Sequence, residues 1–249
     1  MEFLKLNGLI RRRLLVNFRI QPDVVQRLLP DPFKPKLIKG WAMAGICLIR
    51  LEQIRPYWCP APFGLSSENA AHRIAVCWMD AGNQFQEGVY IPRRDSNSII
   101  NHLFGGKLFP GEHQRASFDV HDNGDTIDLR AHALDDLLTI ELRGKCTDTL
   151  PPTSVFSDLQ EASNFFKNGS LGYSETAARK SLDAVRLITT RWAVQPFNAE
   201  VIKSSYFANP LLFPEGTVEF DCALIMRNIE HSWQVAPKLQ ISQCARSEI

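Results

Sequence analysis

Residues 115–142, RASFDVHDNGDTIDLRAHALDDLLTIEL, carry the clearest strand pattern of the chain. Ile127 and Leu129 alternate with polar residues, which is typical of a strand with one solvated face. Asn123-Gly124 predicts a tight hairpin turn, because type I′ turns need positive φ at both central residues. We therefore predict three antiparallel strands, with the Asn123-Gly124 turn joining two of them.

Residues 95–120, which overlap the start of this meander, predict a short helix, a turn and the first strand. Ser96 or Ser98 can cap the helix, since a serine oxygen accepts from an orphan N–H of the first turn. The pair Gly105-Gly106 would end the helix, because glycine tolerates positive φ. Glycine, proline, histidine, lysine and arginine are concentrated after it, which makes this turn a candidate functional segment, although most connectors of this kind carry no chemistry. An ordinary connector without chemistry is the alternative.

The rest of the chain is also predicted to form mainly strands. We expect helices at residues 21–30 and 157–166, a proline-rich loop at 55–64 and a polar surface insertion at 173–183. The remaining strands are predicted at residues 14–20, 41–54, 72–79, 89–92, 185–194, 198–206 and 218–227. Apolar residues on both faces of 41–54 indicate burial on both sides. The predicted fold class is mainly β, an antiparallel barrel with a few short outer helices.

The composition is that of a globular protein. The chain has 249 residues, 45% hydrophobic and 22% charged, which is enough for one large core. We expect a single domain over residues 1–249, with the core at about 10–230 and a frayed tail at 231–249. The net charge of +1 argues against a nucleic-acid partner. The run Arg11-Arg12-Arg13 is interpreted as a solvated strand entry.

The sequence favours a reducing compartment. Its first residues lack the apolar segment of a secretory signal, and no apolar run reaches the ~18 residues of a membrane helix. The six cysteines form no CxxC pair and are expected to be free thiols. We therefore expect a cytoplasmic protein without a membrane partner, and homo-oligomerisation stays open.

No motif predicts a metal or a cofactor. The sequence contains no HExxH, CxxC or GxSxG motif and no glycine-rich nucleotide-binding loop. His113, His121 and His132 lie on neighbouring predicted strands and could converge, but exposed strand histidines are the commoner outcome. We expect neither a metal nor a cofactor.

Lys107 is a candidate amine nucleophile. To attack a carbonyl at neutral pH, its pKa would have to fall by about three units from ~10.4. A desolvated pocket or a neighbouring cation can lower an ammonium pKa, and Arg115 is a candidate for that cation. Glu112 would act in the opposite direction, because a nearby carboxylate stabilises an ammonium.

Several short strings, in a common order, resemble the acetoacetate decarboxylase-like superfamily and its uncharacterised YqjF-like bacterial branch, a domain of unknown function. The likeness covers about residues 10–230. Its strings lie at residues 17–19, 22–30, 88–92, 108–116, 156–166 and 191–196, with a strand that starts at Gly40. The resemblance implies a cone-shaped antiparallel β-barrel with a ligand cavity inside.

The chain departs from the decarboxylases at the catalytic position. In that family a Phe-Pro dipeptide is followed by two lysines, the first of which forms a Schiff base while the second lowers its pKa. Here Phe109-Pro110 is followed by Gly111-Glu112, and no Lys-Lys pair occurs in the chain. The resemblance therefore implies the barrel but not the decarboxylase activity.

The first functional hypothesis is a protein that binds a small organic molecule in its barrel. That molecule could be an anion, held near Glu112, His113 and Arg115. Arg19 and Tyr90 are further ligand-binding candidates. This hypothesis requires no covalent chemistry.

Two alternatives stay open. One is an enzyme that acts on a small carbonyl or lactone-like substrate, with His113 as acid/base and Arg115 as anion clamp. Lys107 would be its second catalytic candidate. The other is a filled barrel that serves as a scaffold or interaction protein.

Overall fold

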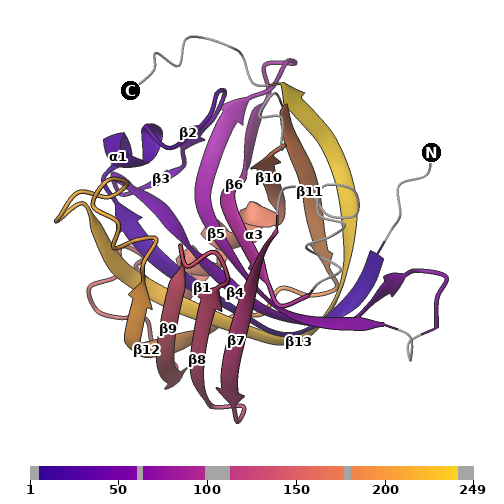
Figure 1. Cartoon of the computed structure of the whole chain (residues 1–249). Coiled ribbons are helices and arrows are strands. Elements are labelled where there is room, and N and C mark those ends of the chain that lie inside the picture. Colours follow the sequence, from indigo (N-terminus) through magenta and orange to yellow (C-terminus); the bar gives the residue numbers. More distant parts are fainter. Residues whose placement is uncertain (1–5, 61–63, 99–112, 177–180, 241–249) are drawn as a thin grey trace.

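The computed structural model describes residues 6–60, 64–98, 113–176 and 181–240, and they form a mainly β fold (Figure 1). The strands are β1 (Leu6–Ile20), β2 (Lys34–Pro35), β3 (Leu37–Ile38), β4 (Trp41–Pro56), β5 (Leu65–Met79), β6 (Phe85–Ser96), β7 (Gln114–Asp122), β8 (Thr126–Ala133), β9 (Thr139–Cys146), β10 (Leu171–Glu175), β11 (Ser181–Thr189), β12 (Gln195–Ser204) and β13 (Val218–Gln240). The helices are α1 (Pro22–Gln26) and α3 (Leu159–Lys167), followed by the 3-10 turn η2 (Asn168–Ser170).

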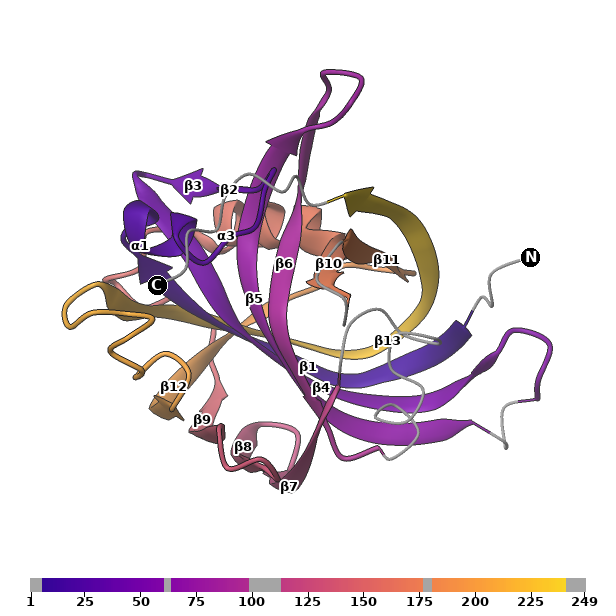
Figure 2. The same ribbon diagram turned by 45° about the horizontal axis from the view of Figure 1, so that its top comes forward.

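The strands belong to one sheet that closes into two rings (Figures 1 and 2). The small ring follows the pairings β13–β1–β4–β5–β6–β10–β11 and returns to β13. The large ring leaves β6 through β7, β8, β9 and β12 and also returns to β13. The pairings in both rings are antiparallel except β6–β7 and β6–β10, which are short and parallel.

Strands β13, β1, β4, β5 and β6 form a wall that both rings share, so each of its faces meets a different interior. On β4, Ile46 and Leu48 are buried with the core of the large ring. Cys47 and Ile49, which alternate with them along the strand, face the small ring. The prediction that this strand is buried on both sides is confirmed, and its cause is that one strand separates two interiors.

The meander prediction is confirmed by β7, β8 and β9, but the turn differs in detail. Gly124 has φ +99°, whereas Asn123 is not among the residues with positive φ. The Asn123 side chain instead accepts hydrogen bonds from the backbone N–H groups of Asp125 and Thr126. The asparagine therefore stabilises the turn through its side chain, as Asx turns do.

Helix α3 packs against the small-ring face of the shared wall. Asp158 caps it by accepting from the backbone N–H of Glu161. Ala162 and Phe166 are buried against Leu15 and other wall residues. The predicted helix at 157–166 is therefore present, and it covers part of the inner face of the small ring.

Several predicted boundaries were wrong. The helix expected at 21–30 is the short α1, which ends at Gln26. The expected surface insertion at 173–183 contains the last part of β10 and the start of β11, with Tyr173 and Leu182 buried. Its polar sequence conceals this burial, because β10 pairs with β6 far away in the chain. The expected short helix after Ser98 lies outside the described residues.

The C-terminal part of the core also differs from expectation. Strand β13 continues to Gln240, beyond the boundary set at residue 230, because its last part pairs with β11. The strand expected at 185–194 ends at Thr189. Pro196, which lies between the strands expected at 185–194 and 198–206, belongs to β12.

Gly45 brings β4 and β1 into close contact and gives the first prediction. A Cβ at this position would lie 2.1 Å from the Val16 carbonyl oxygen, which is backbone and cannot turn away. We expect Gly45→Ala to lower the free energy of unfolding by about 1–3 kcal/mol, measured by urea denaturation. Gly82→Ala is the control, because its nearest neighbour is a side chain at 3.3 Å. Equal effects of the two substitutions would contradict the close-contact argument.

His72 is fully buried in the large ring, where its ring centroid lies 4.4 Å from that of Tyr206. Burial lowers its pKa to about 3, from 6.5. Between these values the unfolded chain binds a proton that the folded chain does not, so stability falls as the pH drops from 6.5. One such group changes the free energy of unfolding by at most about 1.4 kcal/mol for each pH unit.

Between pH 6 and pH 4, the unfolding free energy of the wild type should therefore fall more steeply with decreasing pH than that of His72→Leu. The expected difference in slope is about 1.4 kcal/mol per pH unit. The measurement is chemical denaturation of both proteins at a series of pH values. His121→Gln serves as control, because the His121 side chain is 83% exposed. If the slopes of wild type and His72→Leu coincide, His72 is not buried as a neutral side chain.

Candidate functional site

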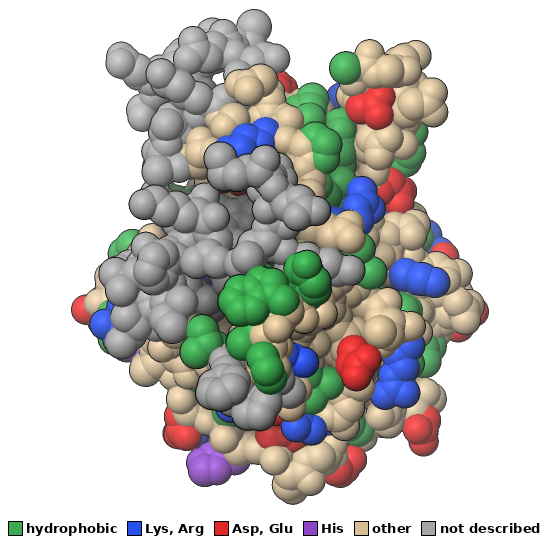
Figure 3. All heavy atoms as spheres, turned by 90° about the vertical axis from the view of Figure 1, so that its right-hand side faces the viewer, with side chains coloured by type: hydrophobic (Ala, Val, Ile, Leu, Met, Phe, Trp, Pro, Cys, Tyr) green, Lys and Arg blue, Asp and Glu red, His purple; other side chains and the backbone are tan. Residues whose placement is uncertain are grey.

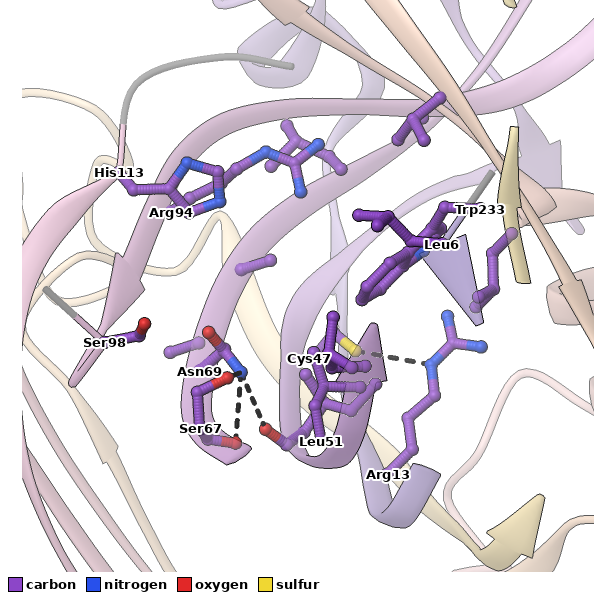
Figure 4. Close-up of a pocket in the computed structure, with 18 of the residues that line it drawn as sticks. Leu6, Arg13, Cys47, Leu51, Ser67, Asn69, Arg94, Ser98, His113 and Trp233 are labelled. Atoms are coloured by element: carbon purple, nitrogen blue, oxygen red, sulfur yellow. Dashed lines mark hydrogen bonds between the residues drawn. The ribbon is translucent and has the colours of Figure 1, made fainter. Parts of the chain in front are cut away.

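A cavity of about 320 Å³ lies inside the small ring (Figure 4). It is lined by residues from every strand of that ring and from the turn η2. Its apolar lining includes Ile49, Leu51, Val89, Ile91, Val185 and Leu187. This volume falls at the lower end of the range for small-molecule sites. The large ring is instead filled by the main hydrophobic core.

The outer face beside the small ring is also partly apolar. The segment between β4 and β5 projects there, and Tyr57 and Trp58 are each 68% exposed. Figure 3 shows hydrophobic side chains gathered on this side of the molecule. These aromatics do not line the cavity as far as the described residues go.

Four arginines line the cavity: Arg13 from β1, Arg55 from the end of β4, Arg73 from β5 and Arg94 from β6. Arg55 donates to the backbone oxygens of Gln53 and Cys59, and the other three are the cavity arginines. Figure 4 shows Arg13 and Arg94 reaching in from these separate strands. None of the three forms an ion pair with a carboxylate of the described residues. Buried charges in proteins are normally paired, so this arrangement is unusual.

Arg73 is the most deeply buried of the three, with 7% of its surface exposed. Its Nη2 donates to the Asn17 side-chain oxygen, and its guanidinium lies 5.1 Å from the centre of the Phe166 ring. Its Nε is buried without a hydrogen-bond partner in the described part of the chain. Burial lowers the pKa of Arg73 to about 10, which still leaves it charged at neutral pH.

Arg94 has a similar environment. Its Nε donates to the Ser174 hydroxyl at 3.2 Å, while its Nη2 is buried with no partner among the described residues. Burial lowers its pKa to about 10 as well. Gly172 lies beside the guanidinium, since a Cβ there would be 3.9 Å from Nη2. Two guanidinium groups therefore each leave a buried N–H free around the same cavity.

Arg12 shows how the same residue type behaves as a structural charge. It is 2% exposed, and it binds Glu68 at 2.6 Å and Asp122 at 3.4 Å. Asp122 also receives two 2.8 Å hydrogen bonds from Arg227. This paired network holds the end of β7 against β1, β5 and β13. The cavity arginines have no comparable counter-charge.

Asp95 is the one carboxylate among the described lining residues. It accepts hydrogen bonds from Arg93, which also binds Asp135 on the loop after β8. Burial raises the pKa of Asp95, and the contact with Arg93 opposes that rise. Asp95 is therefore engaged by Arg93 and does not neutralise the three cavity arginines.

Of the predicted site residues, His113 lines the cavity (Figure 4). Arg115 is exposed on β7 and is not part of the lining. Lys107 and Glu112 lie outside the described residues. The structure therefore does not bring Arg115 to His113's cavity.

Arg19 and Tyr90 also lie away from the cavity lining. Arg19 pairs with Glu219 and Asp221. The Tyr90 hydroxyl donates to Glu175 at 3.1 Å, and its ring packs in the large-ring core. The side chains of Arg19 and Tyr90 are therefore both engaged in structural contacts outside the cavity.

The sequence interpretation missed the three cavity arginines. Arg13 was grouped with a solvated basic run, yet adjacent strand residues point to opposite faces, so Arg12 and Arg13 enter different rings. The available signal in the sequence is the position of Arg73 between Ala71 and Ala75, in a stretch of strand that is apolar apart from Arg73 and His72.

Among the described residues, no group of three or more histidine, cysteine, aspartate or glutamate side chains could hold a metal ion. Within the described part of the chain, no helix has the length and apolar character needed to cross a membrane. All five described cysteines are free.

Comparison with known proteins gave one family and a set of similar folds. The family model DUF2071, described as an uncharacterized conserved protein, matches residues 10–219. No curated protein matches the sequence.

Three solved structures are similar in fold. An acetoacetate decarboxylase-like enzyme from Sphingomonas wittichii RW1 has a TM-score of 0.57 and 14% identity, over 97% of this chain and 94% of that one. Acetoacetate decarboxylase from Legionella pneumophila has a TM-score of 0.58 and 12% identity, over 93% and 87%. The enduracididine biosynthesis enzyme MppR, complexed with pyruvate, has a TM-score of 0.55 and 10% identity, over 96% and 90%. The predicted acetoacetate decarboxylase-like fold is confirmed.

Proposed function

We propose, from the premise that the chain belongs to the DUF2071 family of uncharacterised conserved proteins, that its small ring binds a small organic anion with an apolar portion. The observation that carries the proposal is the presence of three arginines around one cavity without a paired carboxylate. Leaving a buried charge unpaired is costly, and a bound anion would remove that cost. A planar guanidinium also matches the two oxygens of a carboxylate.

The apolar lining supports a ligand that is only partly polar. Aliphatic side chains from β4, β6 and β11 surround the arginines, so the rest of the ligand would be hydrocarbon. MppR, similar in fold, was solved with pyruvate, a small carboxylate. At 10% identity this likeness concerns the fold alone, and it serves here only to suggest the kind of ligand to test.

We further propose that the protein does not use Schiff-base chemistry. No lysine lines the cavity in the part of the chain that the structure describes. Lys107 remains the amine to be tested, since its position lies outside that part. Free cysteines fit a reducing compartment such as the cytoplasm.

An enzyme is the second candidate, because His113 lines the same cavity as the arginines. As an enzyme, the protein would use His113 as the acid/base that transfers a proton to or from a small carbonyl or lactone-like substrate. Arg13, Arg73 and Arg94 would hold the anion, a role that the sequence had suggested for Arg115.

The binding proposal is tested with pairs of small carboxylic acids and their neutral amides, by calorimetry and thermal shift. We expect the acids to bind and the amides to bind at least about tenfold more weakly. Arg94→Gln should weaken acid binding by about tenfold or more, because a charged hydrogen bond contributes about 1.5–3 kcal/mol. Arg115→Gln is the matched control and should bind as wild type does. Equal binding of acids and amides would overturn the proposal.

The absence of Schiff-base chemistry is tested with acetoacetate and borohydride. We expect no covalent adduct by intact-mass spectrometry and no decarboxylation. A stoichiometric adduct that disappears in Lys107→Ala would establish Lys107 as a nucleophile and refute this part of the proposal.

A further inference from the structure

Cys47 lies on β4 at the boundary between the cavity and the packed end of the small ring. It is 7% exposed, lines the cavity and contacts the cluster that includes Phe166 of α3. Figure 4 shows its sulfur atom directed toward Arg13. The proposed anion-binding function gives no role to this thiol.

Positive charge surrounds the Cys47 sulfur. The Nε of Arg13 donates a hydrogen bond to Sγ at 3.3 Å. Burial lowers the pKa of Arg73 and Arg94, and electrostatic interaction with Cys47 opposes this lowering in both. Arg13 therefore contacts the sulfur atom directly, and Arg73 and Arg94 line the same cavity as Cys47. Cations beside a thiol favour the thiolate, which is the nucleophilic form of cysteine.

The site does not rest on the cysteine alone. Arg73 is more than nine-tenths buried, lines the cavity and has an Nε without a hydrogen-bond partner among the described residues. Arg94 leaves its buried Nη2 free in the same way. These donors point to an anionic ligand beside the sulfur, independently of the thiol.

Cys222, on strand β13, which β1 separates from β4, provides a contrast within the same molecule. It is fully buried and does not line the cavity. Burial and the adjacent Asp221 carboxylate raise the pKa of its thiol far above the ordinary value. Of these two buried cysteines, only Cys47 combines access to the cavity with cationic neighbours.

We infer that Cys47 is a nucleophilic thiol that forms a covalent bond with small carboxylates carrying an electrophilic carbon, which the cavity arginines hold in place. This inference rests on the proposed anion-binding function and adds the reacting atom and the substrate class. The arginines have two effects: they orient the carboxylate, and they stabilise the negative charge on sulfur before attack.

The chemistry needs no oxidant or cofactor. With an α,β-unsaturated acid, the thiolate attacks the β-carbon, the carbon–sulfur bond forms and the carbon–carbon π bond opens. The α-carbon then takes one proton, from water or from His113, which lines the same cavity. With an α-halo acid, the carbon–sulfur bond forms as the carbon–halogen bond breaks, and halide leaves with its electron pair. The thiol proton is released to solvent in that case.

The test uses two alkylating probes that differ in charge, iodoacetate and neutral iodoacetamide. The rate at each cysteine of the folded protein is read by peptide mass spectrometry. The measured quantity is the iodoacetate-to-iodoacetamide rate ratio at Cys47, divided by the ratio for glutathione. We expect at least about a tenfold increase, which corresponds to about 1.4 kcal/mol. Cys77, away from the cavity lining, should show a ratio near that of glutathione.

Arg13→Gln and Arg94→Gln should each lower the ratio at Cys47, whereas Arg115→Gln should leave it unchanged. A non-reactive carboxylate should protect Cys47 against iodoacetate. Cys47→Ser should lose alkylation at this position yet still bind that carboxylate, which separates the thiol's role from anion binding. A Cys47 ratio equal to that of glutathione, or no reaction with either probe, would overturn the inference. If carboxylates still bind in that case, the proposed function stands; if they do not, both fail.

Discussion

The shared wall is the constraint on which the rest of the structure depends. Strands β13, β1, β4, β5 and β6 close both rings, so their two faces must each suit a different interior. Along its buried length this wall has no solvated face on which a charge can lie. A charged residue there pairs across a ring, as Arg12 does with Glu68 and Asp122, or faces the cavity, as Arg73 does, whereas His72 is buried as a neutral side chain.

The two rings use the same wall in opposite ways. The large ring is filled by aliphatic and aromatic side chains, including stacked Phe18 and Phe207. The small ring combines arginines with small residues such as Ala71 and Gly172 along its lining. Small residues leave space, and buried cations exclude a purely hydrocarbon filling. The cavity is therefore a consequence of residue choice on one face of the wall, while the other face supplies the packed core.

Short sequence patterns correctly predicted the features that depend on residues close together in the chain. The β7–β9 meander was correct, because alternation and an Asn-Gly turn act over a few residues. The two-sided burial of β4 was correct for the same reason. The β10–β11 region was not, since β10 is held by β6 about eighty residues earlier in the chain, and the last part of β13 by β11. The cavity arginines could not be assigned either, because which ring a strand face meets is decided by such distant pairings.

Identities of 10–14% with solved structures establish the fold and leave the chemistry to the lining residues. In the proposed function, those residues would couple ligand binding to stability. Arg73 and Arg94 keep their charges against the cost of burial, which weakens the folded state. An anion that binds only the folded chain adds a stabilisation that grows with the logarithm of its concentration, and it also relieves that cost. In the proposed function, the same unpaired charges that weaken the folded state would give the small ring a preference for anions. A neutral ligand of equal shape would fill the cavity but leave the guanidinium groups uncompensated.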